Sequence, residues 1–216
     1  MSYIGSTPAN KPVVASDLDP AVITGQTALA TSPADTDEFL ISDAGVLKRL
    51  DASLIGGGGK IGQVVSATKT DTFSSTSDTM TDISGLAVAI TPSASNSKVL
   101  VMVNFNVSID LNDRYCVFQL VRGSTVLSVG AASGSRTVGS VAHVRVAGSG
   151  AANAIAEYSI NFLDSPSSTS EETYKMQGLA QSDNNPGFRI NMSGADANAV
   201  HGFRLASTIT VMEVLA

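Results

Sequence analysis

Two histidines and one cysteine are the side chains best suited to bind a transition metal or to move protons near neutral pH. Cys116 stands alone, which excludes an intramolecular disulfide and a cysteine-based zinc site. A metal or general-base role for His143 or His201 would need convergent partners, which spacing along the chain does not supply. We therefore expect both histidines to be structural. The alternative places His143, on a predicted strand face with Val141 and Arg145, at a subunit interface.

Carboxylates could act as ligands for a hard cation or as a glycosidase pair. The run Asp110-Leu111-Asn112-Asp113 offers oxygen ligands but lacks the glycine and the distal glutamate of an EF-hand loop, so a polar hairpin is favoured. Glycan hydrolysis needs two acids opposed across a cleft. The neighbours Asp35 and Asp37, or Glu171 and Glu172, do not meet that requirement.

Glycine-rich stretches could form phosphate-binding loops. Gly59-Lys60-Ile61 lacks the Ser or Thr of a Walker motif, and Leu54 stands where its first glycine belongs. Gly148-Ser149-Gly150 does not lie in a strand-to-helix unit, so a flexible turn is expected there. The Gly-x-Ser-x-Gly elbow of hydrolases does not occur. The sequence therefore predicts no enzyme, no catalytic residue, no cofactor and no metal site.

Composition and charge narrow the classes of partner. The 216 residues are 43% hydrophobic and 15% charged, without tryptophan, which suits strands and turns better than long charged helices. A net charge of −6 without a basic cluster argues against nucleic acid, and Lys48-Arg49 is interpreted as solvated surface. No signal peptide and no apolar run of membrane-spanning length is seen. We expect synthesis in a host cytoplasm and no membrane insertion.

Four consecutive glycines at residues 56–59 predict a linker between two parts. Residues 1–55 are acidic and rich in proline, which predicts an extended arm. Within the arm, residues 38–42 and 46–50 predict a small β-hairpin closed by Asp43-Ala44-Gly45, with glycine supplying a positive φ. A short helix is the alternative interpretation, since its stripe would use Leu47, Leu50 and Leu54.

Residues 60–216 predict an antiparallel, jelly-roll-like β-sandwich, so the expected fold class is all-β. The clearest strand runs through residues 101–109, where Val, Phe and Ile alternate with mostly polar residues. Gly-, Ser-, Asn- and Pro-rich turns separate about ten such segments, as in sandwiches. The other predicted strands are 61–69, 86–90, 114–121, 125–129, 141–147, 156–162, 173–180, 187–192 and 207–215.

Many strand positions hold Ala or Thr where a monomer would bury Leu or Phe, so the core of one subunit is expected to be thin. In residues 207–215, Ile209 and Val211 alternate with Thr208, Thr210 and Met212, and both faces are semi-apolar. This pattern is typical of a strand buried against a sheet and a neighbouring subunit. We expect a homo-oligomer, most simply a trimer made by the β domain, with a buried strand of a monomer as the alternative.

Several phrases resemble tail-fibre and related virion proteins of tailed bacteriophages, especially those of marine and cyanobacterial phages. The resemblance is carried by Met1-Ser2-Tyr3-Ile4-Gly5, by residues 37–50, by Lys60-Ile61-Gly62-Gln63-Val64-Val65, by Ile90-Thr91-Pro92-Ser93 and by Ser97-Lys98-Val99-Leu100-Val101. It implies that residues 1–55 dock on other virion proteins and that residues 60–216 trimerise and face outward.

Three functions follow from the arm, the linker and the sandwich. The first is a short trimeric tail fibre or fibre tip for host attachment, with polar loops at Ser165–Glu172 and Asp183–Gly187 contacting a host-surface glycan or protein. The second is capsid decoration, as a cement or head-fibre protein. The third and weakest is a glycan-active enzyme. The sequence identifies no receptor-binding residue, and the expected location is the virion.

Overall fold

The computed structural model describes residues 27, 34, 36–44, 46–55, 60–110, 114–146, 153–180 and 187–216. The chain divides into two compact units, Met1–Gly58 and Gly59–Ala216. The predicted linker at residues 56–59 and nearly all of the predicted arm before residue 36 lie outside the described residues.

The described part of the first unit is a β-hairpin. Strands β1 (Glu38–Asp43) and β2 (Val46–Asp51) pair antiparallel, and the 3-10 helix η2 (Ala52–Ile55) follows. The predicted hairpin is confirmed, and the helical alternative is wrong because Leu47 and Leu50 lie in a paired strand. A positive φ of 50° falls on Ala44; the glycine predicted to supply it lies outside the described residues.

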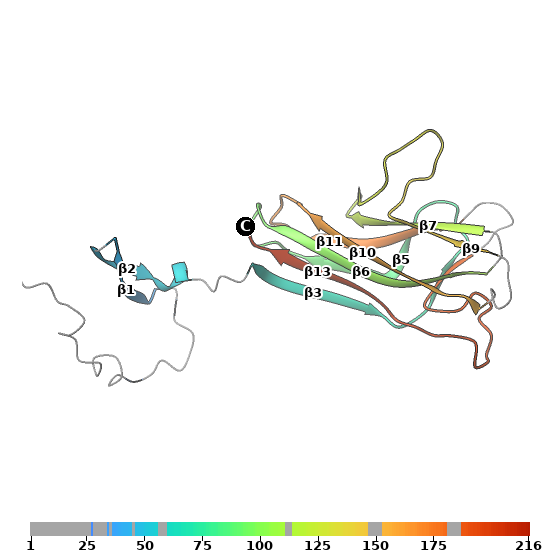
Figure 1. Cartoon of the computed structure of the whole chain (residues 1–216), viewed down its shortest axis with the longest axis horizontal. Coiled ribbons are helices and arrows are strands. Elements are labelled where there is room, and N and C mark those ends of the chain that lie inside the picture. Colours follow the sequence, from blue (N-terminus) through green and yellow to red (C-terminus); the bar gives the residue numbers. More distant parts are fainter. Residues whose placement is uncertain are drawn as a thin grey trace, which may run out of the picture. The chain divides into compact units, whose positions relative to one another are not determined.

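The second unit, the β domain, consists of two antiparallel sheets whose strands run along the length of the domain (Figure 1). The predicted all-β sandwich is confirmed. The six-stranded sheet contains β3 (Ile61–Lys69), β4 (Phe73–Ser75), β6 (Lys98–Ile109), β10 (Ala156–Asp164), β12 (Phe188–Ile190) and β13 (Ser207–Val214). The five-stranded sheet contains β5 (Thr81–Ile90), β7 (Arg114–Arg122), β8 (Thr125–Leu127), β9 (Val141–Arg145) and β11 (Glu172–Ala180).

The core lies between the inner faces of the two sheets. Strand β6 supplies the alternating apolar set predicted from the sequence, and Val101, Val103 and Phe105 are completely buried. The ring of Phe118 on β7 packs edge-on against Phe105 and Phe188, with both centroid distances at 5.2 Å. Further buried members are Ile83, Leu86, Val88, Ile90, Val99, Val107, Ile109, Cys116, Leu120, Tyr174, Met176, Ile190, Ile209 and Val211.

Three local predictions need correction. The segment beginning at Asp110 does not close a hairpin, because β6 and β7 belong to different sheets and the segment connects them. Two predicted strands end early because Ser128 and Asn191 have φ values of 52° and 63°, which extended backbone does not adopt. Strand β4 is short and was not predicted.

The β domain has an entry end, where the chain enters it, and a distal end opposite. At the entry end, Val214 pairs with both Ile61 and Lys98, and the Leu215 amide donates to the Lys60 carbonyl at 2.7 Å. At the distal end β3 and β6 finish, and β12 and β13 begin. Loops that leave β12 therefore lie a full strand length away from the entry of the chain.

Candidate functional site

The loop between β12 and β13, residues 191–206, occupies the distal end. Its two sides are held together: the Leu205 amide donates to the Asn191 carbonyl at 3.0 Å, and Met192 forms an isolated antiparallel bridge with Arg204. The Ser108 hydroxyl of β6 donates to the Met192 carbonyl at 2.7 Å. The loop is thus attached to the six-stranded sheet at its base, and its outer part, residues 195–204, is mostly exposed.

Asn191 fastens this base from the inside. Its side chain is fully buried, and its amide nitrogen donates to the carbonyl oxygens of Lys69 at 2.8 Å and Asp71 at 3.0 Å. Its side-chain oxygen accepts a hydrogen bond from the Ser207 hydroxyl at 2.6 Å. These contacts join the start of the loop to the end of β3, to the connection between β3 and β4, and to the start of β13. The start of the loop is therefore fixed to the sheet.

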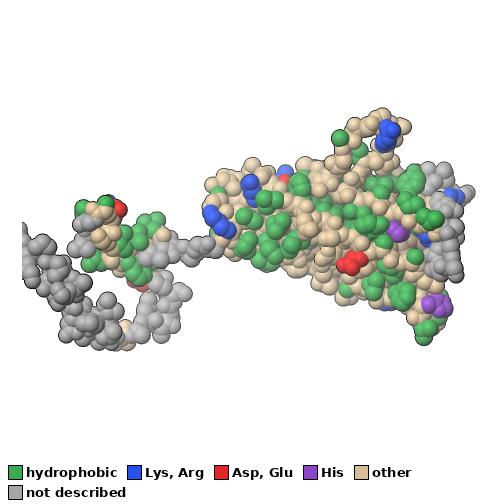
Figure 2. Space-filling view, viewed as in Figure 1, with side chains coloured by type: hydrophobic (Ala, Val, Ile, Leu, Met, Phe, Trp, Pro, Cys, Tyr) green, Lys and Arg blue, Asp and Glu red, His purple; other side chains and the backbone are tan. Residues whose placement is uncertain are grey.

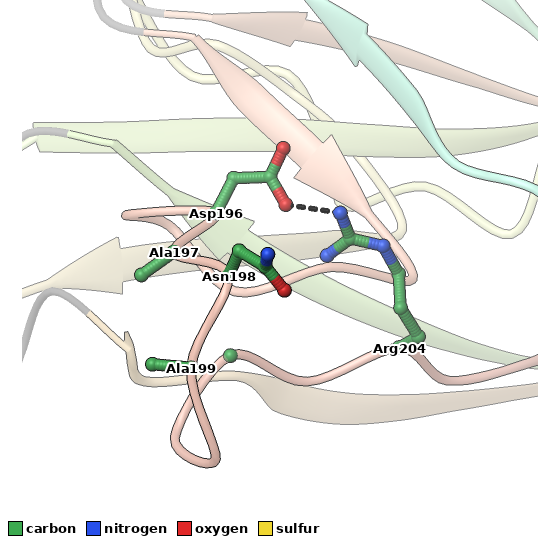
Figure 3. Close-up of a pocket in the computed structure, with 6 residues that line it drawn as sticks. Asp196, Ala197, Asn198, Ala199 and Arg204 are labelled. Carbon is green, nitrogen blue, oxygen red and sulfur yellow. Dashed lines mark ion pairs between the residues drawn. The ribbon is translucent and has the colours of Figure 1, made fainter.

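The outer part of the loop encloses a hollow of about 310 Å³. Asp196 and Arg204 form an ion pair across it, and the Asn198 amide points into the same space (Figure 3). The rest of the lining is small and mostly apolar: Ala197, Ala199 and Gly202. Carboxylate, amide and guanidinium groups therefore converge on one opening at the far end of the domain.

Gly202 is required for the shape of the hollow. A Cβ at this position would lie 1.9 Å from the Ala197 carbonyl oxygen, which is far inside van der Waals contact. The Gly202 amide donates to the Ala199 carbonyl at 2.8 Å, and the Ala199 amide donates to the Ala197 carbonyl at 2.9 Å. The loop therefore closes on itself by backbone contacts, without help from the Asn198 side chain.

The tip of the loop is exposed and partly apolar. The Val200 side chain is 100% exposed and that of Phe203 is 46% exposed, although both are hydrophobic. His201, between them, is exposed as well. The structure therefore places His201 at the distal surface.

His143 lies in the opposite environment, inside the domain. Its Nδ1 lies 3.0 Å from the Tyr158 hydroxyl, and its ring packs edge-on against the Tyr158 ring. The buried Cys116 thiol contacts the His143 carbonyl at 3.9 Å. Burial lowers the pKa of His143 and raises the pKa of the Cys116 thiol. His143 is packed within one subunit, so the alternative that places it on a subunit surface is not supported.

A second surface lies on the outer face of the six-stranded sheet near the entry end. Four residues in register form a row across four strands, and we call it the apolar row: Leu163, Leu100, Met212 and Val64. Leu163 is 47% exposed and Val64 is 55% exposed. Figure 2 shows hydrophobic side chains gathered on the surface at this end of the β domain.

The neighbouring row toward the distal end is also uncharged. It consists of Asn161, Met102, Thr210 and Ser66, again in register. The hydroxyl oxygens of Ser66 and Thr210 lie 2.8 Å apart. Together the two rows make an uncharged band across β10, β6, β13 and β3. The semi-apolar outer face predicted for residues 207–215 is therefore present, and it continues over three neighbouring strands.

Beneath this surface, the entry end contains a buried carboxylate. Glu213 accepts hydrogen bonds from the Ser93 amide and the Ser93 hydroxyl, both at 2.6 Å, and from the Gln63 side chain at 3.2 Å. Burial alone would raise the pKa of Glu213, but these hydrogen bonds outweigh it and lower the pKa to about 2. The charge ties the loop after β5 to the last strand.

Of the two loops predicted to contact a receptor, Ser165–Glu172 and Gly187 of the second are described, and they lie at opposite ends of the β domain. Ser165–Glu172 is at the entry end, because Asp164 pairs with Val99 and Glu172 pairs with Ile90. Glu172 is engaged there by Arg122, at 3.9 Å. Residues 183–186 lie outside the described residues, as do 111–113. Gly187 is described and sits at the distal end, where its amide donates to Asp110 at 2.8 Å.

Sequence reasoning missed the surface feature formed by residues 195–204. The available signal was a stretch of small and polar residues, Ser193-Gly194-Ala195-Asp196-Ala197-Asn198-Ala199, between two predicted strands. Such a stretch predicts a loop and says nothing about which side chains converge. Among the described residues, no three His, Cys, Asp or Glu side chains gather as metal ligands, and no helix has the length and hydropathy to cross a bilayer.

No protein-family model and no curated protein matches the chain. A solved structure of the infectious bursal disease virus Gt strain aligns with 81% of this chain and 41% of its own, at 11% identity and a TM-score of 0.36. The Gx strain aligns with 81% and 40%, at 11% identity and 0.35. A VP2 subviral particle of the same virus aligns with 84% and 43%, at 11% identity and 0.25. The chain spans about two fifths of the matched chains' length, and TM-scores this low define neither a shared fold nor a shared function.

Proposed function

We propose that the chain is a non-enzymatic structural protein of a tailed-phage virion, a short tail fibre or fibre tip that attaches to the host surface. The observation that carries the proposal is the placement of the two ends of the β domain. The chain enters beside Lys60 at one end, and the hollow of residues 196–204 opens at the other. A subunit fixed to a particle through its N-terminal residues would hold that hollow outward.

The resemblance to fibre and virion proteins supports the same orientation. It lies in residues 1–5, 37–50, 60–65, 90–93 and 97–101. It implies that residues 1–55 dock on other virion proteins. The acidic excess of residues 1–59, seven acidic against three basic side chains, suits a basic socket on another virion protein.

Oligomerisation, with a trimer as the proposed state, is supported by the apolar row. Exposed apolar side chains in register across a sheet are stabilised when a second protein surface covers them. The band around Met212 carries no charged side chain, which allows two copies of a chain with net charge −6 to meet there. The entry points of the chains would then lie side by side, in the arrangement a fibre attached by several arms requires.

Capsid decoration is the second candidate, and one observation favours it. The apolar row is at the entry end, so it could rest on another virion protein rather than on a second copy of this chain. The sandwich would then project from a head protein, and the distal loop would need no receptor.

Adsorption and location on the particle separate these functions. The purified full chain should bind cells of the bacterium that the phage infects and should compete with phage adsorption. Imaging of virions that carry a labelled subunit should place it on the tail. Absence of both cell binding and competition would overturn host attachment, and a label on the capsid would favour decoration.

A further inference from the structure

We propose that the hollow at residues 196–204 binds one neutral hexose unit of a glycan. The inference rests on the proposed host-attachment function and names the chemical class of its ligand. Asp196, Asn198 and Arg204 would bind the sugar hydroxyls, and the small residues Ala197, Ala199 and Gly202 of the lining leave room for the ring.

The polar groups match the hydrogen-bonding capacity of a diol. Each sugar hydroxyl both donates and accepts, so neighbouring hydroxyls need acceptors and donors side by side. The Asp196 carboxylate only accepts, the Arg204 guanidinium only donates, and the Asn198 amide does both. Among the described residues the Asn198 side chain makes no hydrogen bond to the protein; it is exposed and points into the hollow. Its amide is therefore available to a ligand.

The charges indicate a neutral sugar. Asp196 and Arg204 neutralise one another, so an anionic sugar would have to compete with the carboxylate for the guanidinium. The net charge of −6 would further weaken the approach of an acidic glycan. A neutral hexose can contact both partners without separating them.

Size and lining indicate binding of one ring without cleavage. The volume of about 310 Å³ lies at the lower end of small-molecule sites, which suits a single ring of a longer chain. Asp196 is the only carboxylate in the lining, whereas glycoside hydrolysis uses two. A single shallow site would bind in roughly the millimolar range, and several linked copies would raise the overall affinity of a virion for its host.

Saturation-transfer NMR on the full chain tests the proposal, with the methyl glycosides of glucose, galactose and mannose as neutral probes and glucuronate as the anionic probe. We expect transfer to at least one neutral glycoside and little to glucuronate. Asn198→Ala should weaken that binding at least tenfold, because it removes the amide that would bind the sugar. The loop should keep its shape, since backbone contacts close it. Asn96→Ala is the matched control, since Asn96 is exposed at the entry end of the domain. Gly202→Ala should abolish binding by deforming the loop.

Three results would overturn the proposal: no transfer to any neutral glycoside, equal transfer in Asn198→Ala and the wild type, or stronger binding of glucuronate. Cell adsorption of the same proteins separates this proposal from the function on which it rests. If wild type and Asn198→Ala adsorb to cells equally, the protein attaches to the host but does not use the hollow to do so. If the protein binds sugar but does not adsorb to cells, the sugar site is confirmed and the proposed host-attachment function is wrong.

Discussion

The side-chain amide of Asn191 donates a hydrogen bond to the carbonyl oxygen of Lys69 at 2.8 Å, joining residues 122 positions apart. The bond joins the start of the distal loop to the end of the first strand of the domain. The same amide reaches Asp71, and Ser207 donates to its oxygen, so one buried side chain organises four segments around the loop base.

Replacing Asn191 with alanine should lower the free energy of unfolding by about 4 kcal/mol, because buried carbonyl and hydroxyl groups lose their partners. Urea unfolding would measure the loss. Asn191→Gly separates two contributions: it removes the same hydrogen bonds but tolerates the φ of 63°, so it should be roughly 1 kcal/mol less destabilising than Asn191→Ala. Equal stability of the two variants would show that backbone strain plays no part.

Glu213→Gln should destabilise the β domain by about 3 kcal/mol at neutral pH. Glutamine presents an NH₂ group to donors at Ser93 and Gln63, which leaves buried donors unsatisfied. The pKa of Glu213 falls from an ordinary 4.5 to about 2 on folding, so its contribution is complete above pH 4.5 and disappears toward pH 2. The free energy of unfolding should therefore fall more steeply below pH 4.5 in wild type than in the variant.

His143 should make the protein less stable in mild acid. Burial lowers its pKa below the ordinary 6.5, so the unfolded chain binds the proton more tightly and stability falls as the pH drops below 6.5. His143→Gln keeps a side chain able to bond the Tyr158 hydroxyl but does not titrate. Between pH 7 and 5 the melting temperature should fall less in this variant than in wild type. An equal fall in both proteins would contradict a buried, neutral histidine.

Met212→Asp should dissociate the proposed oligomer into monomers, because it would bury an unpaired carboxylate in the centre of any interface made by the apolar row. Light scattering or analytical ultracentrifugation should give a mass about that of the 22.1 kDa monomer. Ser159→Asp is the control, an exposed position on β10, and should leave the mass unchanged. A wild-type chain that is monomeric at micromolar concentration would remove the interface altogether.

Gly178→Ala should destabilise the core by about 1–3 kcal/mol, the usual cost of overpacking. The new Cβ would lie 2.8 Å from the rings of Phe118 and Phe188, which are fully buried and pack edge-on against each other. Gly130→Ala is the control, since nothing lies within 4 Å of a Cβ there. Denaturant unfolding that does not distinguish the two variants would contradict this packing.

The strands were predictable because one face of each is buried. Val101, Val103 and Phe105 alternate with Met102 and Asn104, and a sheet with one face in the core produces that pattern directly. The hairpin at residues 38–51 was predictable for a different reason: a turn segment separates two short runs of strand formers. Both signals are local, and both were confirmed.

Arrangements made by distant residues were not predictable from the sequence alone. The pattern that identifies β6 and β7 as strands does not say that they belong to different sheets, so the prediction of a hairpin after Asp110 was wrong. The hollow depends on Arg204 returning to Asp196 around a loop closed by backbone contacts. Residue types in a small, polar stretch do not specify such a closure.

The burial of Cys116 makes this protein a clean background for site-specific chemistry. Thiol reagents attack the thiolate, and burial raises the pKa of this thiol, so the wild-type chain should resist them. A cysteine introduced at Val200, whose side chain is fully exposed at the loop tip, would be the one reactive thiol among 216 residues. A dye or spin label attached there would follow the distal end of each subunit as a particle meets a cell.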